Sequence, residues 1–117
     1  MNIYGDMSLS KYQFIVIVLM FFSSLSYAEN ITVKISKLGC HKDTNVCFAY
    51  IDLGRPIETN CTRNDGSIRW DGMNDNNAAS IMAFLLASQA QDKKVTFGGA
   101  GETCFMDFPS FRWVHTN

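Results

Sequence analysis

The residue types that could do chemistry in this chain are four cysteines and two histidines. The cysteines are Cys40, Cys47, Cys61 and Cys104. No pair of cysteines has the CxxC spacing, and no pair of histidines has the HxxxH spacing, that zinc sites typically use. A hydrolase or transferase needs a nucleophile and a base held together, and we expect His41 and His115 to be solvated side chains. The sequence therefore predicts a protein that is not an enzyme and that holds no metal and no cofactor.

An apolar run at positions 14–22, FIVIVLMFF, follows Lys11 and precedes the small residues of SSLSYA. This pattern is typical of a secretory signal peptide, with Ser26 and Ala28 at the −3 and −1 positions of the cleavage site. The alternative is an uncleaved membrane anchor. The run does not favour an anchor, because a helix needs about 20 apolar residues to span a bilayer.

Cleavage at this site divides the chain into a signal peptide at residues 1–28 and one mature domain at 29–117. Initiation at Met1 or at Met7 would give the same mature domain. The predicted location is secreted or periplasmic, with no stable membrane insertion once the signal peptide is removed. The formal net charge of -1 gives no electrostatic reason to expect nucleic acid as a partner.

All four cysteines lie in the predicted mature domain, and an even count in a small exported chain favours disulfides over free thiols. Three pairings are possible. The polar segment HKDTNV separates Cys40 from Cys47 and lies between two strand-like runs, so a hairpin would bring these two cysteines together. That pairing leaves Cys61 with Cys104. We expect the longer ring to contribute more to stability, because it constrains the unfolded chain more.

Hydrophobic periodicity predicts a series of strands interrupted by one helix. In residues 31–38, apolar residues alternate with polar ones, the pattern of a strand with one buried face. The further elements expected are a strand at 46–53, an extended run through Cys61, a hairpin turn RNDG at 63–66, a strand at 67–71, a helix from about 76 to 91, a strand at 94–97, a flexible loop GGAG at 98–101 and a last strand from Phe111. Asn74 or Asp75 is the expected N-cap of the helix. This order indicates a β-rich α+β fold, a small OB-fold-like Greek-key barrel with one helix between later strands.

The predicted helix has almost no polar face. One apolar stripe at helical spacing consists of Ala78, Ile81, Met82 and Leu85, and a second consists of Ala79, Ala83, Leu86 and Ala90. A helix that lies on one barrel needs only one stripe. We therefore expect the first stripe to face the barrel and the second to contact another copy of the chain in a homo-oligomer. In the alternative, the segment from Phe105 to Phe111 covers the second stripe.

Several of these features occur together in one class of bacterial toxin. They are the signal peptide, the early paired strands, the helix NAASIMAFLLASQAQ followed closely by KKVTF, and a cysteine in the segment after it. With them the chain resembles the OB-fold B subunits of bacterial AB toxins. It also resembles small uncharacterised exported bacterial proteins with RW, a helix rich in Ala and Leu, KKV and GxGxC, which read here as Arg69–Trp70, Ala78 to Ala90, Lys93 to Val95 and GAGETC.

The resemblance implies a secreted pentamer that binds cell-surface glycans, with the helices packed around a central pore. Pore-lining helices of such pentamers usually carry charges, whereas residues 76–91 carry none. This departure leaves two alternatives to a pentamer with a wet pore. One is a dimer, and the other is a helix sandwiched between the barrel and a loop.

The residues that could recognise a sugar are aromatic and polar side chains near strand ends and in late loops. An aromatic ring stacks on the apolar face of a sugar while polar groups hydrogen-bond its hydroxyls. The candidates are Trp70, Asn74, Phe105, Asp107, Arg112 and Trp113. The sequence thus predicts a secreted or periplasmic non-catalytic binding module whose partner is a cell-surface glycan or a protein. The alternatives are an inhibitor that blocks a hydrolase with a loop such as GGAGETCF, a small structural envelope protein, and a small enzyme using His115.

Overall fold

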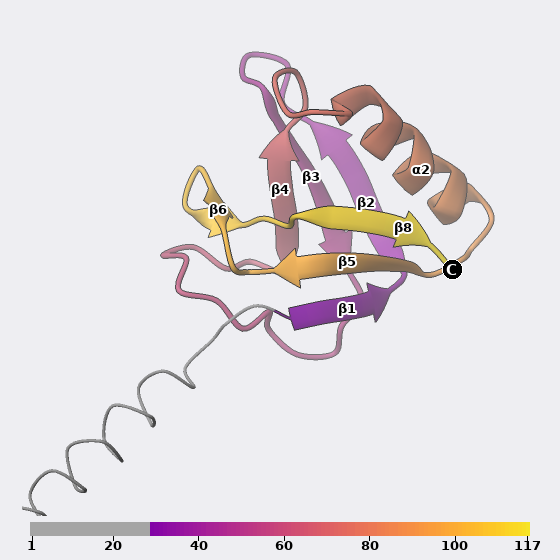
Figure 1. Ribbon diagram of the computed structural model, residues 1–117, viewed down its shortest axis with the longest axis horizontal. Coiled ribbons are helices and arrows are strands. Elements are labelled where there is room, and N and C mark those ends of the chain that lie inside the picture. The colour runs from indigo at the N-terminus through magenta and orange to yellow at the C-terminus, as the bar shows by residue number, and fades with distance from the viewer. Residues whose placement is uncertain (1–28) are drawn as a thin grey trace, which may run out of the picture.

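The computed structural model describes residues 29–117. The predicted signal peptide, its cleavage site and the choice between Met1 and Met7 lie outside the described residues. The described chain is a β-rich α+β domain with three small antiparallel sheets and a single helix (Figure 1). Its elements are, in order, β1 (Glu29–Val33), β2 (Ile35–Cys40), β3 (Val46–Ile51), β4 (Ser67–Asp71), α2 (Ala78–Ala90), β5 (Val95–Ala100), β6 (Cys104–Phe105), β7 (Phe108–Pro109) and β8 (Trp113–Thr116).

Two three-stranded sheets make up most of the domain. The first sheet has the strand order β1-β5-β8 and the second has the order β2-β3-β4. The strands of one sheet cross those of the other (Figure 1). β1 and β2 are separated only by Lys34, so one extended run passes from the first sheet into the second. Ile31, Val33 and Ile35 are all buried along this run, which is the face that the alternation predicts.

An aromatic contact joins the two sheets inside the domain. The ring of Phe111 lies 5.7 Å from that of Trp70 on β4 and 5.0 Å from that of Phe97 on β5, with an edge-on geometry in both pairs. Aromatic pairs of this kind contribute about 0.5–1.5 kcal/mol each beyond the area that they bury. Trp70 is 1% exposed and Phe97 is fully buried, so both belong to the core.

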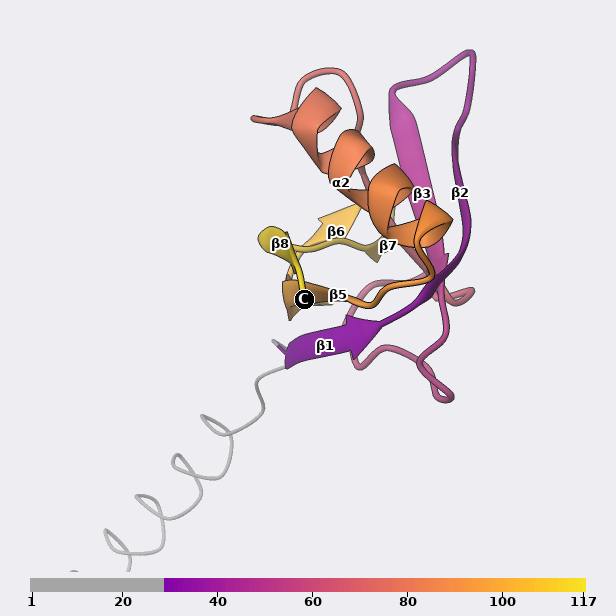
Figure 2. The ribbon, with the colours of Figure 1, turned by 90° about the vertical axis from the view of Figure 1, so that its right-hand side faces the viewer.

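Helix α2 packs against β2 of the second sheet and β8 of the first (Figure 2). Leu85 and Ala78 are buried against the sheets, and Ile81 and Met82 are half-buried. The second stripe, Ala79, Ala83, Leu86 and Ala90, is exposed in this single chain. The segment from Phe105 to Phe111 does not cover it. In residues 29–117 the structure has no helix that is both long enough and apolar enough to cross a membrane.

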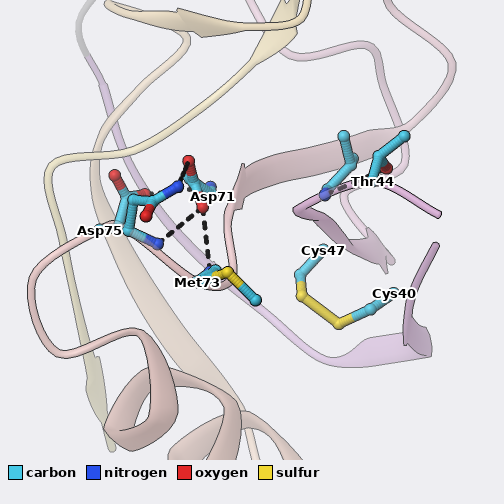
Figure 3. Close-up of a disulfide and its surroundings, with 8 residues drawn as sticks. Cys40, Thr44, Cys47, Asp71, Met73 and Asp75 are labelled. Carbon is cyan, nitrogen blue, oxygen red and sulfur yellow. Dashed lines mark hydrogen bonds between the residues drawn. A yellow bond between two sulfur atoms is a disulfide. The ribbon is translucent and has the colours of Figure 1, made fainter. Parts of the chain in front are cut away.

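Two disulfides cross-link the domain. Cys40 and Cys47 are directly opposite each other at the ends of β2 and β3 and form the first (Figure 3). Cys61 and Cys104 form the second, which ties the irregular segment between β3 and β4 to β6. Both are the pairs that the cysteine spacing favours. Gly72 packs on the first disulfide so closely that a Cβ there would overlap the Cys47 sulfur.

The GGAG stretch is not a flexible loop, as the sequence suggested. Gly98, Gly99 and Ala100 belong to β5, and only Gly101 lies in the turn that follows. Trp113 is the cross-strand partner of Gly98, and its indole ring lies across the glycine where a Cβ would otherwise be. The glycine is therefore needed to seat a tryptophan on the neighbouring strand.

Other predicted elements also differ from the structure. The extended run through Cys61 forms no strand, so RNDG at 63–66 is a bend that leads into β4 and not a hairpin turn. A short hairpin, β6–β7, was not predicted, and the last strand begins at Trp113 instead of Phe111. These segments depend on packing and on the second disulfide, which local patterns do not encode.

The start of the helix also differs from the prediction. The residue at the N-cap is Asn77, which has a positive φ of 61° and makes no side-chain capping hydrogen bond. The predicted caps Asn74 and Asp75 lie in the preceding turn, which the Asp71 carboxylate organises by accepting hydrogen bonds from the backbone N–H groups of Met73 and Asn74 (Figure 3). These hydrogen bonds lower the pKa of Asp71. The turn is therefore stabilised by Asp71, before the helix begins.

Replacing Leu85 with alanine should lower the free energy of unfolding by about 2–5 kcal/mol, because it leaves a cavity at a fully buried site. Met73 supplies a matched control, since its side chain is 74% exposed. Met73→Ala should change the free energy by less than about 0.5 kcal/mol. Urea denaturation followed by tryptophan fluorescence measures both. Equal losses in the two variants would contradict the assignment of Leu85 to the core.

Candidate functional site

A groove of about 780 Å³ lies between the β2–β3 turn and the β6–β7 hairpin, beside β4. Its volume falls within the range of about 300–1,000 Å³ that is typical of ligand sites. The lining residues are His41, Lys42, Asp43, Thr44, Val46, Arg63, Arg69, Cys104, Met106, Asp107 and Phe108. One disulfide closes the β2–β3 turn, and the other links the segment of Arg63 to the hairpin. Both walls of the groove are thus cross-linked.

Arg69 is held in the groove by three neighbours. Its Nε–H group donates a hydrogen bond to Ser67 Oγ at 3.1 Å, and its Nη2 group donates one to Asp65 Oδ2 at 3.2 Å. The guanidinium also lies 3.5 Å from the centre of the Phe108 ring, a cation–π contact. The side chain is only 13% exposed. Its orientation is therefore fixed before any ligand arrives.

Asp65 organises the side chains behind Arg69. It accepts hydrogen bonds from the Tyr50 hydroxyl at 3.0 Å and from the Ser67 backbone N–H at 3.1 Å. Partial burial alone would raise the pKa of Asp65, but the hydrogen bonds from Ser67 and Tyr50 and the charge of Arg69 lower it below its ordinary value. The hydrogen bond to Asp65 raises the pKa of Tyr50 in turn. At neutral pH the carboxylate is charged and the phenol is protonated.

The β6–β7 hairpin forms one wall of the groove and has an unusual tip. Phe105 pairs with Phe108, so Met106 and Asp107 make a two-residue turn, with φ angles of 50° and 71°. Such left-handed conformations normally favour glycine or asparagine. They cost of order 1–3 kcal/mol per residue and persist only where surrounding contacts impose them. Here the Arg63 N–H donates a hydrogen bond to the Asp107 carbonyl at 2.9 Å, and Cys104 is cross-linked.

Trp70, one of the six residues predicted to bind a ligand, belongs to the core. It is 1% exposed and packs on Phe111, so no face of its ring is open to a ligand. The side-chain amide of Asn74 donates a hydrogen bond to Asp71 at 3.0 Å and so supports the turn before α2. These two residues have structural contacts that the sequence did not indicate.

The other four predicted residues are divided between two regions. Asp107 lines the groove, and Phe105 is half-buried on the same hairpin. Arg112 forms an ion pair with Glu102 at 2.8 Å, on the chain segment before β8. Trp113 lies on β8, is 43% exposed and stacks on His115 with ring centres 5.2 Å apart. The structure therefore does not gather the six predicted residues into one site.

Sequence reasoning did not identify Arg69 as a member of the groove. A signal for Arg69 was present, because Ile68 and Trp70 on either side of it are typical buried strand residues and Arg69 must then face the other way. His41 is exposed, as expected, and it also lines the groove, 5.4 Å from the Phe48 ring.

Asp65→Asn should destabilise the protein by about 1 kcal/mol at neutral pH, because it removes the charged acceptor of several hydrogen bonds. The folded-state pKa of Asp65 is depressed, so its contribution is present above the ordinary pKa of about 3.9 and is lost as the pH falls below it. Urea denaturation at pH 7 and pH 3 tests the sign. The exposed Asp52→Asn is the control. If the free energies of unfolding of wild type and Asp65→Asn differ as much at pH 3 as at pH 7, the lowered pKa of Asp65 is wrong.

The comparisons with known proteins assign no family to this chain. No protein-family model, no curated protein and no solved structure matches it. The resemblance to toxin B subunits therefore stays a hypothesis. The function has to be argued from the groove, the hairpin and the exposed helix.

Proposed function

We propose that this chain is an exported, non-catalytic binding module that holds a glycan in the groove between the β2–β3 turn and the β6–β7 hairpin. The observation that carries the proposal is the groove itself, in which a half-buried aromatic ring, Phe108, lies among donors and acceptors from Thr44, Asp43 and Asp107. Sugars are recognised by this combination of an apolar ring and polar groups. The two disulfides are compatible with a secreted or periplasmic location.

The strand order supports an OB-fold-like Greek-key barrel. The bent run β1–β2 pairs with β3 on one side and with β5 on the other, and α2 lies between β4 and β5 in the chain. In OB-folds, oligosaccharides and oligonucleotides bind on the face of the second and third strands, near the loops that follow the first and fourth strands. With β1–β2 counted as one strand, the groove has this location. The formal net charge of -1 favours a sugar over a nucleic acid.

A toxin-B-like assembly is the second part of the proposal. Ala79, Ala83 and Ala90 are exposed on α2, as are the larger Leu86 and Phe84, which are 52% and 48% exposed. Small side chains allow another helix to approach closely, and a second copy of α2 would bury this surface. Figure 1 places α2 and the β6–β7 hairpin on opposite sides of the domain, and Figure 2 shows the hairpin behind the helix. Assembly through α2 would leave the groove open.

One observation favours a rival function, the inhibition of a hydrolase. Met106 is 61% exposed at the tip of a hairpin whose shape is imposed by a disulfide and a backbone hydrogen bond. A rigid projecting loop loses little entropy when it enters the cleft of an enzyme. The inhibitor would use the tip of the hairpin, whereas the glycan would lie in the groove below it.

Phe108→Ala should weaken glycan binding at least about tenfold, because aromatic anchors in a pocket contribute most of the binding energy. A glycan array probed with the mature protein in multivalent form identifies the ligand, and titration calorimetry compares the variants. Met73→Ala, at an exposed residue that does not line the groove, should bind like the wild type. No binding to any glycan at high valency would reject the proposal. Capture of a hydrolase from envelope extract that is lost in Met106→Ala would favour the inhibitor.

Ala83→Glu should dissociate the proposed homo-oligomer while the monomer stays folded, since the side chain of Ala83 is exposed in the single chain. The control is Asn60→Glu, which introduces the same charge in the exposed segment between β3 and β4. Sedimentation velocity at micromolar to high micromolar concentration measures the mass of each. A wild-type protein that sediments as a monomer throughout this range would disprove assembly through α2.

A further inference from the structure

The donors of Arg69 are only partly used by the protein. A guanidinium carries five N–H donors in a planar fork. In the described residues two hydrogen bonds from Arg69 have protein acceptors, Ser67 Oγ and Asp65 Oδ2. No acceptor within residues 29–117 is assigned to its Nη1 group. Because Arg69 lines the groove, its remaining donors are available to a ligand.

A second guanidinium lies at the same end of the groove. Arg63 is 5.7 Å from the centre of the Phe108 ring, the ring on which Arg69 packs at 3.5 Å. Among residues 29–117, Arg63 has no ion-pair partner. Both arginines line the groove and lie on one aromatic ring, and of the two only Arg69 is paired with a carboxylate, that of Asp65.

The remaining charges of the groove lie at its two rims. Lys42 and Asp43 are neighbours in the exposed β2–β3 turn and offset each other there. Asp107 is exposed at the tip of the hairpin. Arg63 and Arg69 are the two cationic groups of the groove that lie against Phe108. Paired guanidinium groups match the geometry of carboxylate, sulfate and phosphate oxygens, which they bind through two hydrogen bonds at once.

We propose that Arg63 and Arg69 form an oxyanion-binding subsite, so that the groove prefers ligands that carry a carboxylate or a sulfate. Arg69 supplies the oriented donors, and Arg63 supplies the second charge. Asp65 and Tyr50 are positioning residues, because they hold the Arg69 fork in place without touching the ligand. This inference rests on the proposed function only for the ligand being a glycan, and it adds that the glycan is acidic.

The subsite is tested first without any glycan. Sodium acetate and sodium sulfate are titrated into ¹⁵N-labelled mature protein at constant ionic strength, and the shifts of the Arg69 Nε–H and Phe108 amide signals are followed by NMR. We expect saturable shifts that are lost in Arg63→Gln and in Arg69→Gln. The difference between the acetate and sulfate titrations shows which oxyanion the subsite prefers. Non-saturable shifts in the wild type, or anion binding by the two glutamine variants that is as tight as that of the wild type, would overturn the proposal.

Arg63→Gln and Arg55→Gln show whether a lost response comes from the subsite or from a loss of folding. Arg69→Gln removes a partner of Asp65, whereas Arg63 is exposed and its replacement disturbs no ion pair. Arg55→Gln is the matched control, because Arg55 is an exposed arginine paired with Glu29 outside the groove. Arg55→Gln should keep the full response to both anions. A loss of response in Arg55→Gln equal to that in Arg63→Gln would mean a diffuse charge effect and would overturn the subsite.

Glycan pairs then separate this inference from the proposed function. Each pair shares one oligosaccharide core and differs by one carboxylate or sulfate. We expect the wild type to bind the acidic member at least about tenfold more tightly than the neutral member. We expect Arg63→Gln to bind the two members with equal affinity. Equal binding of both members to the wild type would overturn the subsite and leave the glycan function standing. Saturable binding of the simple anions without binding of any glycan would support the subsite and reject the glycan function.

Discussion

The contact of Phe111 with Trp70 and Phe97 is the interaction on which the rest of this domain depends. Each of the two larger sheets has only three strands, and a domain of this size buries a small core. Phe111 lies edge-on to a ring from each sheet and so connects the two sheets through side chains. The run β1–β2 is a second connection, made through the backbone. β4 ends one residue after Trp70, and β8 begins two residues after Phe111, so the contact joins the end of one sheet strand to the start of another.

The disulfides add constraints where this small core ends. Cys40–Cys47 closes the β2–β3 turn, and Cys61–Cys104 anchors the hairpin and the irregular segment that carries Arg63 and Asp65. In the chain-entropy model the longer ring contributes about 4 kcal/mol, the larger of the two contributions. Covalent bonds therefore add to the stability of both walls of the groove. This arrangement lets polar side chains stay exposed on a domain that has little core to hold its loops.

The sequence predicted the features that depend on local patterns. The alternation through Ile31 and Val33, the uncharged helix and the cysteine pairing around HKDTNV are all encoded within a few residues. The groove is not, since Arg69 gains its role only when the β6–β7 hairpin brings Phe108 onto it. That hairpin turns at Met106 and Asp107, which carry no glycine or asparagine signal for left-handed backbone. Residue type alone also could not separate the buried Trp70 from the exposed Trp113.

The uncharged outer surface of α2 has a physical connection to the groove. A single open groove with exposed rims binds a sugar weakly, because few groups are desolvated and the ligand loses its freedom on binding. Linked copies of the same groove raise the overall affinity without any new contact, provided that all of them reach the ligand-bearing surface together. Helix α2 lies on the side of the domain away from the β6–β7 hairpin (Figures 1 and 2). Copies joined through α2 would keep every groove accessible. The apolar side chains that are unfavourable to expose in a monomer would then hold together an assembly whose linked grooves bind a glycan-bearing surface more tightly than one groove does.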